Sequence, residues 1–293
     1  MEPADSELKP REGLSRWLMR PRRQGLAPPP LADTGIWIGM DDIWRGLQTW
    51  PIWMRVARQD IGLRYKRSII GPFWISLSLA AMVVGMALLY SQIFHTEFKG
   101  YLTHLAVSLL CWNYISVAIN ESCSVLADEG LLRALPVSIT GLSGRMMMRN
   151  AIIFFHNMLT VLVMLLIFQA PFHLSALNAI WGIAVYAAFA VILGTILGPI
   201  CLRFRDLSQV IANIVQIIFF LTPIVWQADQ IGGRVAFVTM NPIYHLLEVV
   251  RAPILGQPVH IDTWIFIGVM LTVGLCLALI TLSMTRRRVY MWM

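Results

Sequence analysis

Charged side chains are scarce in this sequence. Asp, Glu, Lys and Arg make up 13% of its 293 residues, whereas a soluble domain carries roughly 25%. Hydrophobic residues reach 57%, more than a soluble fold of this length can hide from water. The shortage of charge excludes an ordinary soluble domain and indicates that a lipid bilayer is part of the solvent.

Lysine is nearly absent. The three lysines, Lys9, Lys66 and Lys99, follow Leu, Tyr and Phe, so a phosphate-binding loop of the form GxxxxGK[ST] cannot be built. The HExxH and GxSxG motifs are absent too. A membrane-embedded transferase would need grouped carboxylates or histidines, and only scattered ones are present. We expect no enzyme activity, cofactor or metal in this chain.

Cysteine is also rare. Cys111, Cys123, Cys201 and Cys276 are scattered, with no CxxC pair and no His–Cys spacing that suits zinc. We interpret them as small hydrophobic residues.

What is abundant is long apolar sequence. Six stretches of roughly 20 residues are each long enough to cross a bilayer; they run over 69–94, 101–120, 146–168, 176–198, 208–225 and 263–284. The sequence therefore predicts an all-α integral membrane protein with six transmembrane helices over residues 69–285.

The basic residues predict its orientation. With both termini in the cytoplasm, 20 of the 23 basic residues lie inside and three lie outside, as the positive-inside rule requires. Residues 286–293 are then a cytoplasmic C-terminus. The net charge of +7 is assigned to anionic lipid headgroups and not to nucleic acid.

The segments before the first span differ in character. Residues 1–35 are rich in proline and arginine, which predicts a disordered cytoplasmic tail. Residues 36–68 predict an amphipathic helix at the inner membrane interface, anchored by Trp44, Trp50 and Trp53. Within it, Asp60 and Arg64 are four residues apart and are expected to pair.

Two connecting segments are unusual. Residues 226–261 are apolar but interrupted by glycine and proline, which predicts short re-entrant or interfacial outer helices over about 226–256. An amphipathic loop lying on lipid is the alternative. Glu248 and Arg251 are expected to pair there.

The other segment predicts a short cytoplasmic helix over about 128–136, with acidic residues at its start and a proline at its end. It either docks on a partner or lies on the bilayer; its residues are Asp128, Glu129, Leu131, Leu132, Arg133, Leu135 and Pro136.

Four strings together resemble one family. They are RYKRS at 64–68 with GPFW at 71–74, RFRD at 203–206, LTPIVW at 221–226, and NPIYH at 241–245 running to RAPILG at 251–256. In this order they resemble the permease subunits of ABC-type polysaccharide exporters, which export O-antigen, capsule or teichoic acid. The resemblance covers roughly residues 42–285.

The resemblance implies a homodimer in the bacterial inner membrane beside a dimer of cytoplasmic ATPases, which hold ATP and Mg. It places the coupling helix at 128–136, the interfacial helix at 42–67 and the re-entrant helices at 226–256. The expected substrate is a lipid-linked polysaccharide. The alternative is a permease of the same superfamily that exports a drug, peptide or lipid.

Candidate contact residues follow. A basic cluster binds either the lipid pyrophosphate or ordinary anionic headgroups; it comprises Arg55, Arg58, Arg64, Lys66 and Arg67. Aromatic residues of the first and fifth spans either line the pore or face lipid; they are Tyr90, Phe94, Phe219, Phe220 and Trp226. The turn residues Arg203, Arg205 and Asp206 contact the ATPase, pair with each other or anchor the turn.

His156 and Asn157 lie deep in the third span, where polar groups are costly. They form an interhelical hydrogen bond or contact the transported substrate.

Overall fold

The computed structural model describes residues 35–64, 66, 73–127, 138–170, 173–226 and 238–292. Within these ranges every regular element is a helix. All of the described residues belong to one compact unit, residues 34–293.

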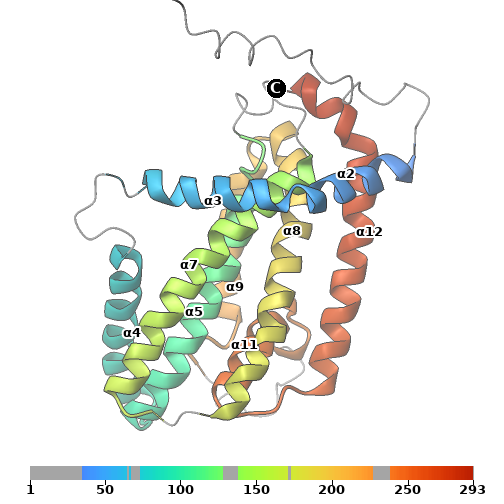
Figure 1. Cartoon of the computed structure of the whole chain (residues 1–293). Coiled ribbons are helices and arrows are strands. Elements are labelled where there is room, and N and C mark those ends of the chain that lie inside the picture. The colour runs from blue at the N-terminus through green and yellow to red at the C-terminus, as the bar shows by residue number, and fades with distance from the viewer. Residues whose placement is uncertain are drawn as a thin grey trace, which may run out of the picture. The chain divides into compact units, whose positions relative to one another are not determined.

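Five long apolar helices run side by side (Figure 1). They are α4 (Phe73–Ile93), α5 (Phe98–Ser122), α7 (Ile139–Ile167), α8 (Ala179–Arg203), which follows the 3-10 helix η1 (Leu174–Asn178), and α12 (Ile261–Trp292). Each is long and apolar enough to cross a membrane. The described structure therefore agrees with the predicted all-α, multi-pass architecture, and five helices, against the six predicted, are long and apolar enough to span a membrane.

The predicted span over 208–225 is shorter than expected. The helix found there, α9 (Leu207–Leu221), has 15 residues and is about 22 Å long, against roughly 30 Å of hydrocarbon. Thr222 leaves the helix with extended angles (φ −100°, ψ 138°). Pro223 explains this, because a residue before proline avoids helical angles.

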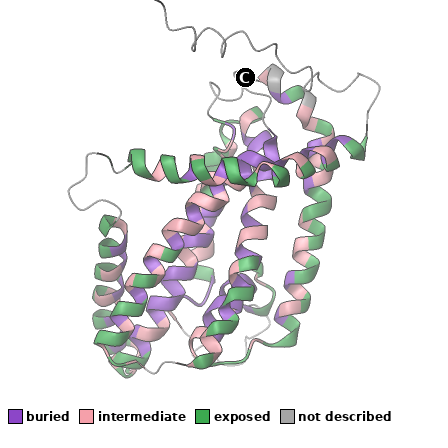
Figure 2. Ribbon diagram, viewed as in Figure 1, coloured by how far each residue is buried: buried purple, intermediate pink, exposed green. Residues whose placement is uncertain are grey.

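Helix α5 lies at the centre of the bundle. It packs against α4, α7, α8, α9 and α11, and 72% of its apolar part is buried, compared with 22% for α4 and 17% for α12. Figure 2 shows the exposed outer faces of α4 and α12. A ring cluster of Tyr114, Phe154 and Tyr186, with centroids 5.0–6.0 Å apart, joins α5 to α7 and α8.

Two helices cross one end of the bundle, here called the α2–α3 end (Figure 1). The single helix predicted over 36–68 is divided into α2 (Ile36–Gln48) and α3 (Trp50–Arg64), with a break at Thr49. Pro51 explains the break, because proline is tolerated in the first turn of a helix but not in its interior. Of the predicted tryptophan anchors, Trp53 is buried together with Ala57, whereas Trp44 and Trp50 are exposed.

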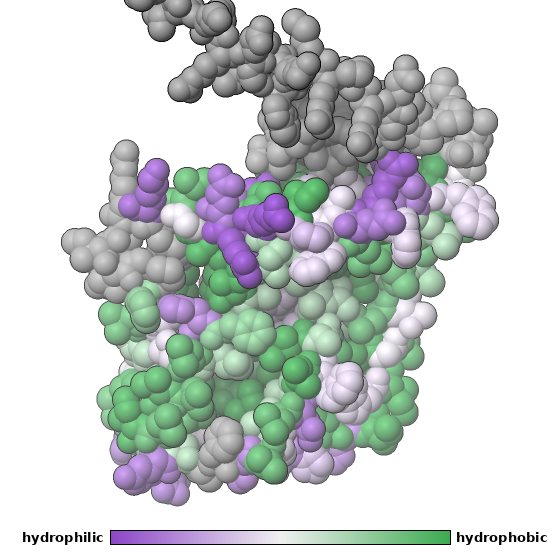
Figure 3. Space-filling model, viewed as in Figure 1, coloured by the Kyte–Doolittle hydropathy of each residue, from purple (hydrophilic) through white to green (hydrophobic). Residues whose placement is uncertain are grey.

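Helix α11 (Pro242–Ile254) lies at the opposite end, here called the α11 end (Figure 1). The Asn241 side chain caps its start by accepting from the backbone N–H of Ile243 at 2.9 Å. Of the predicted outer helices over 226–256, α11 accounts for the second part, while 227–237 lie outside the described residues. The space-filling view shows an apolar surface over the long helices and polar groups along α3 (Figure 3).

A glycine contact between α8 and α11 gives a test of this packing. A Cβ on Gly182 would lie 2.6 Å from the backbone oxygen of Val249, whereas a Cβ on Gly85 in α4 would meet no atom within 4 Å. Gly182→Ala should lower the free energy of unfolding by about 1–3 kcal/mol, read as a lower thermal midpoint in detergent. Gly85→Ala is the control and should be neutral or slightly stabilising. Equal midpoints for the two variants would contradict the packing.

Candidate functional site

A buried carboxylate ties three helices together at the α2–α3 end. Asp42 of α2 is fully buried. It accepts hydrogen bonds from the backbone N–H groups of Ile139 (3.2 Å) and Thr140 (2.9 Å) and from the Thr140 hydroxyl (2.9 Å). Arg286 of α12 lies 3.2 Å away. A carboxylate here satisfies first-turn amides of α7 and faces the positive end of its dipole.

The setting of Asp42 also affects its protonation. Burial raises its pKa above the ordinary value, although the Thr140 hydrogen bonds and the charge of Arg286 act in the opposite direction. The close approach of the helices adds to the constraint, since a Cβ on Gly46 would lie 2.9 Å from the backbone nitrogen of Gly141. Helix α2 is therefore fixed to the first turn of α7.

The predicted coupling segment, residues 128–136, lies outside the described residues, so Asp128, Glu129, Leu131, Leu132, Arg133, Leu135 and Pro136 stay predictions. The segment is nevertheless close in sequence to the Asp42 contact. Ser138 caps α7 by accepting from Gly141 N–H at 3.0 Å, and Ile139 and Thr140 follow it. In sequence, the predicted segment therefore ends two residues before the first turn of α7, to which Asp42 is hydrogen-bonded.

A second charged cluster joins α3, α5 and α7. Arg145 makes two 2.7 Å hydrogen bonds to Asp60, and Arg149 bonds Glu121 at 2.7 Å. Arg149 is also 3.6 Å from Asp60, and Arg64 is 3.8 Å from Glu121. The predicted pairing of Asp60 with Arg64 is wrong, because both residues have partners on other helices.

The predicted basic cluster comprises residues of α3 and of the sequence just after it. Arg55 and Arg58 of α3, and Lys66 beyond it, are exposed and make no ion pair within the described part of the chain. Arg64 is partly engaged by Glu121, and Arg67 lies outside the described residues. The predicted headgroup cluster is therefore largely free to bind anions.

The turn between α8 and α9 is exposed. Arg203, Arg205 and Asp206 all face outward, and no ion pair joins them to one another in the described structure. The Arg203 guanidinium lies over the rings of Trp292 (5.7 Å) and Phe204 (5.9 Å).

The predicted pore aromatics form two groups, and both contact α5. Tyr90 stacks on Phe94 at 5.8 Å, and Phe94 lies 6.1 Å from Tyr101. In the second group Phe219 lies 5.4 Å from Trp112 and 5.3 Å from Phe220, and the Trp226 indole donates to the Phe220 carbonyl. Sequence reasoning missed the α5 members, Tyr101 and Trp112, because nothing in the sequence aligns α5 with α4 or α9.

Helix α9 carries a polar row that sequence reasoning also missed. Gln209, Asn213 and Gln216 are all exposed, and we call them the amide stripe. Their spacing of four and three residues places them on one face, and Phe220, 69% exposed, continues the same line. The Gln209 amide donates to Asn213 at 3.3 Å. The helical spacing of the three amides is visible in the sequence, but the high average hydropathy of the segment conceals it.

At the α11 end, a buried arginine holds the stretch that follows α9. Arg251 donates to the Pro223 carbonyl (2.6 Å) and to the Ser108 hydroxyl (3.2 Å). It also contacts Glu248 at 2.7 and 2.9 Å, which confirms the predicted pair. The Asn241 amide donates to Thr222 at 2.9 Å. The side chains of Arg251 in α11 and of Asn241, which caps it, therefore satisfy polar groups of a non-helical segment.

Metal ligands do not converge in the described ranges: no group of three or more His, Cys, Asp or Glu side chains could hold a metal ion there.

Comparison with known proteins gives one consistent result. No protein-family model matches the chain. Two forms of the O-antigen export system permease protein RfbA from Klebsiella pneumoniae are 22% identical to it over 243 residues, which is 80% of this chain and 91% of each relative. The Myxococcus xanthus protein of the same name is 22% identical over 203 residues, 67% of this chain and 77% of the relative. The predicted resemblance to polysaccharide-exporter permeases is confirmed.

The Asp42 contact predicts a stability difference between two neighbouring carboxylates. Asp42→Ala leaves the Ile139 and Thr140 amides without their buried acceptor, although Arg286 keeps the Ile38 carbonyl and Asp41, and should cost about 3 kcal/mol. Asp41 is 39% exposed and pairs with Arg45 and Arg286 near the surface, so Asp41→Ala should cost only about 0.5 kcal/mol. Thermal unfolding in detergent compares the two. A midpoint for Asp42→Ala no lower than that of Asp41→Ala would contradict the assignment.

Proposed function

We propose that this chain is the transmembrane permease subunit of an ATP-driven exporter that moves a lipid-linked polysaccharide across the bacterial inner membrane. Its similarity to proteins named O-antigen export permeases supports this, as do its five long apolar helices. Because no lysine stands in a phosphate-binding loop, the ATP and Mg belong to a separate ATPase chain.

The amide stripe on α9 is the observation that carries the proposal. Gln209, Asn213 and Gln216 are exposed on a helix that is otherwise apolar. Facing hydrocarbon, such groups would lack full hydrogen bonding and cost free energy. Facing a wet path, the amides donate to and accept from sugar hydroxyls. Phe220, on the same line, offers a flat apolar face to the C–H side of a sugar ring.

We infer that two copies of the chain enclose the path. Helix α9 packs chiefly on α5 and has Val215 as its one buried residue, so most of its surface awaits a partner or lipid. In this arrangement α9 with Thr222–Trp226 makes the fifth of six spans and both termini are cytoplasmic, while Tyr90 of α4 and Phe94 just after it line the path.

The ATPase dimer is proposed to dock on residues 128–136 and on the exposed turn of Arg203, Arg205 and Asp206. A displacement of the docked segment would move the first turn of α7, which begins after Ser138. Because Asp42 is hydrogen-bonded to that turn, α2 and the adjoining α3 would move with it. The exposed Arg55 on α3, with Lys66 beyond the helix, would meet the pyrophosphate of the lipid-linked chain through charge-assisted hydrogen bonds.

A triple substitution tests the proposed path. Replacing Gln209, Asn213 and Gln216 with leucine keeps α9 helical but removes its hydrogen-bonding face. Polysaccharide at the cell surface should fall at least about tenfold, which corresponds to a loss of about 1.4 kcal/mol. The matched control replaces the exposed apolar residues Val210, Ile214 and Ile217 with leucine and should export normally. Normal export by the amide-free variant, at equal protein level, would overturn the assignment of α9.

A second substitution tests where the motor binds. Replacing Leu131, Leu132 and Leu135 with glutamate should abolish co-purification of the ATPase encoded beside this gene, because an apolar contact cannot bury three charges. The control places glutamate at Leu174 and Leu177, which are 80% and 70% exposed at the α11 end, and should keep the ATPase. Retention of the ATPase by the first variant would indicate that the segment lies on lipid instead.

A further inference from the structure

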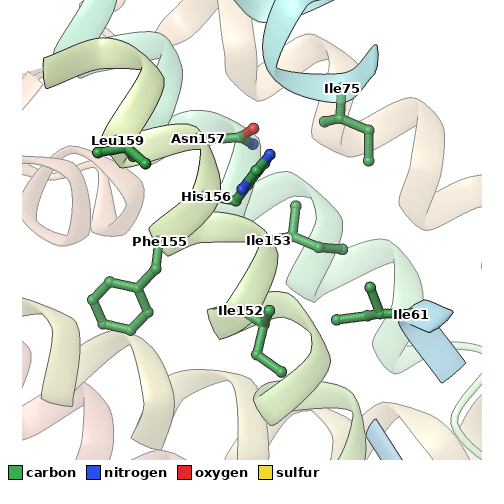
Figure 4. A pocket seen from close by; sticks show the side chains of 8 residues that line it. All are labelled: Ile61, Ile75, Ile152, Ile153, Phe155, His156, Asn157 and Leu159. Atoms are coloured by element: carbon green, nitrogen blue, oxygen red, sulfur yellow. The ribbon is translucent and has the colours of Figure 1, made fainter. Parts of the chain in front are cut away.

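A cleft between α3, α4 and α7 combines apolar walls with polar atoms at its floor. Its volume is about 320 Å³. Six apolar side chains line it together with His156 and Asn157 of α7 (Figure 4); they are Ile61, Ile75, Ile152, Ile153, Phe155 and Leu159. The cleft is thus of a size and character that suit part of an amphiphilic molecule.

The two polar residues of the cleft have unused hydrogen-bonding capacity. The Asn157 side-chain oxygen accepts from the Ser76 hydroxyl at 2.9 Å, which confirms the predicted interhelical bond. Asn157 is only 1% exposed, yet its Nδ2 has no partner within the described structure, and neither has Nε2 of His156. A buried amide left unpaired costs about 1–3 kcal/mol.

The positions of these atoms favour a ligand acceptor that comes from the membrane. The walls are hydrocarbon side chains that supply no acceptor. Asn157 follows Arg149 by eight residues, so it lies about 12 Å further along α7 from the charged cluster. An acceptor at this depth must belong to a molecule that extends inward from the level of the charges.

The rim of the cleft is basic. Ile61 of α3 lines the cleft, and Arg58 and Arg64 stand three residues before and after it on the same side of the helix. Both are exposed; Arg58 makes no ion pair in the part of the chain that the structure describes, and Arg64 makes one long contact, 3.8 Å to Glu121. The cleft therefore offers three kinds of binding group: basic side chains at its rim, hydrogen-bond donors deeper inside, and apolar walls.

We propose that this cleft binds an anionic glycerophospholipid. Its phosphate lies at Arg58 and Arg64, an acyl-ester carbonyl accepts from Asn157 Nδ2, with His156 Nε2 beside it, and the acyl chain packs on Ile152, Phe155 and Leu159. Such a lipid would cover part of α4, of whose apolar part only 22% is buried within the chain. The proposal rests on the membrane placement of the chain and not on which substrate is exported.

The chemistry selects an ester-linked lipid over a prenyl-linked one. Below its phosphate an isoprenoid chain is pure hydrocarbon and carries no acceptor for Asn157 or His156. A glycerophospholipid has two ester carbonyls at that place. The unpaired donors therefore point to a resident membrane lipid and not to the lipid carrier of a sugar chain.

Native mass spectrometry of the full chain in detergent tests the assignment with three probes. They are diacyl phosphatidylglycerol, its dialkyl ether analogue with the same headgroup and chain length, and undecaprenyl phosphate. The wild-type chain should bind the diester about tenfold more tightly than the diether, because the two differ only in the carbonyl acceptors. Equal affinity for diester and diether would overturn the proposal without any variant being needed.

Variants locate the effect. Asn157→Leu should bring the diester-to-diether ratio close to one. Ser76→Ala, the matched control, removes the Ser76–Asn157 bond but keeps Nδ2 and should preserve the ratio. Arg58→Gln should weaken both phosphatidylglycerols equally. Tighter binding of undecaprenyl phosphate than of the diester, unchanged by Asn157→Leu, would also overturn the proposal, while export and ATPase binding would still stand or fall by their own tests.

Discussion

A polar group inside a bilayer has no water to bond, and the structure follows from that constraint. Helices satisfy their own backbone, which explains why every regular element among the described residues is helical. After Leu221, where α9 ends, side chains from other parts of the chain make hydrogen bonds to Thr222, Pro223 and Val225. Arg251 donates to the Pro223 carbonyl, Tyr101 donates to the Val225 carbonyl, and Asn241 donates to the Thr222 hydroxyl. Helix α11 is therefore an integral part of the bundle.

The same constraint concentrates ionic contacts at the α2–α3 end, where they connect helices. Asp42 joins α2 to α7 and α12, and Asp60 joins α3 to α7. Both contacts are to the first two turns of α7, immediately after the segment proposed to meet the ATPase. A push on that segment would therefore act on α2 and α3 through short hydrogen bonds, and α3 carries Arg55, which is proposed to meet the lipid pyrophosphate.

Local patterns in the sequence predicted the long apolar helices and the Glu248–Arg251 pair, because each depends on neighbouring residues alone. The break at Thr49 could have been predicted from Pro51, and the early end of α9 from Pro223. The high average hydropathy of these segments concealed both signals. The partners of Asp42 and Asp60 could not be predicted, since Thr140 and Arg145 lie more than 80 residues away in sequence. The amide stripe was predictable from its spacing, whereas the contact of Phe219 with Trp112 required the packing of α9 on α5.

Accessibility of α9 to water tests the central claim most directly. In a chain whose four native cysteines are replaced by alanine, single cysteines are placed at Asn213 and at Val269, an exposed apolar position of α12. A charged, water-soluble maleimide reacts with a thiolate, which forms only where water reaches the sulfur. The account predicts rapid labelling at position 213 and little at 269 in native membranes. Equal labelling at both positions, or none at 213, would contradict a wet path along α9.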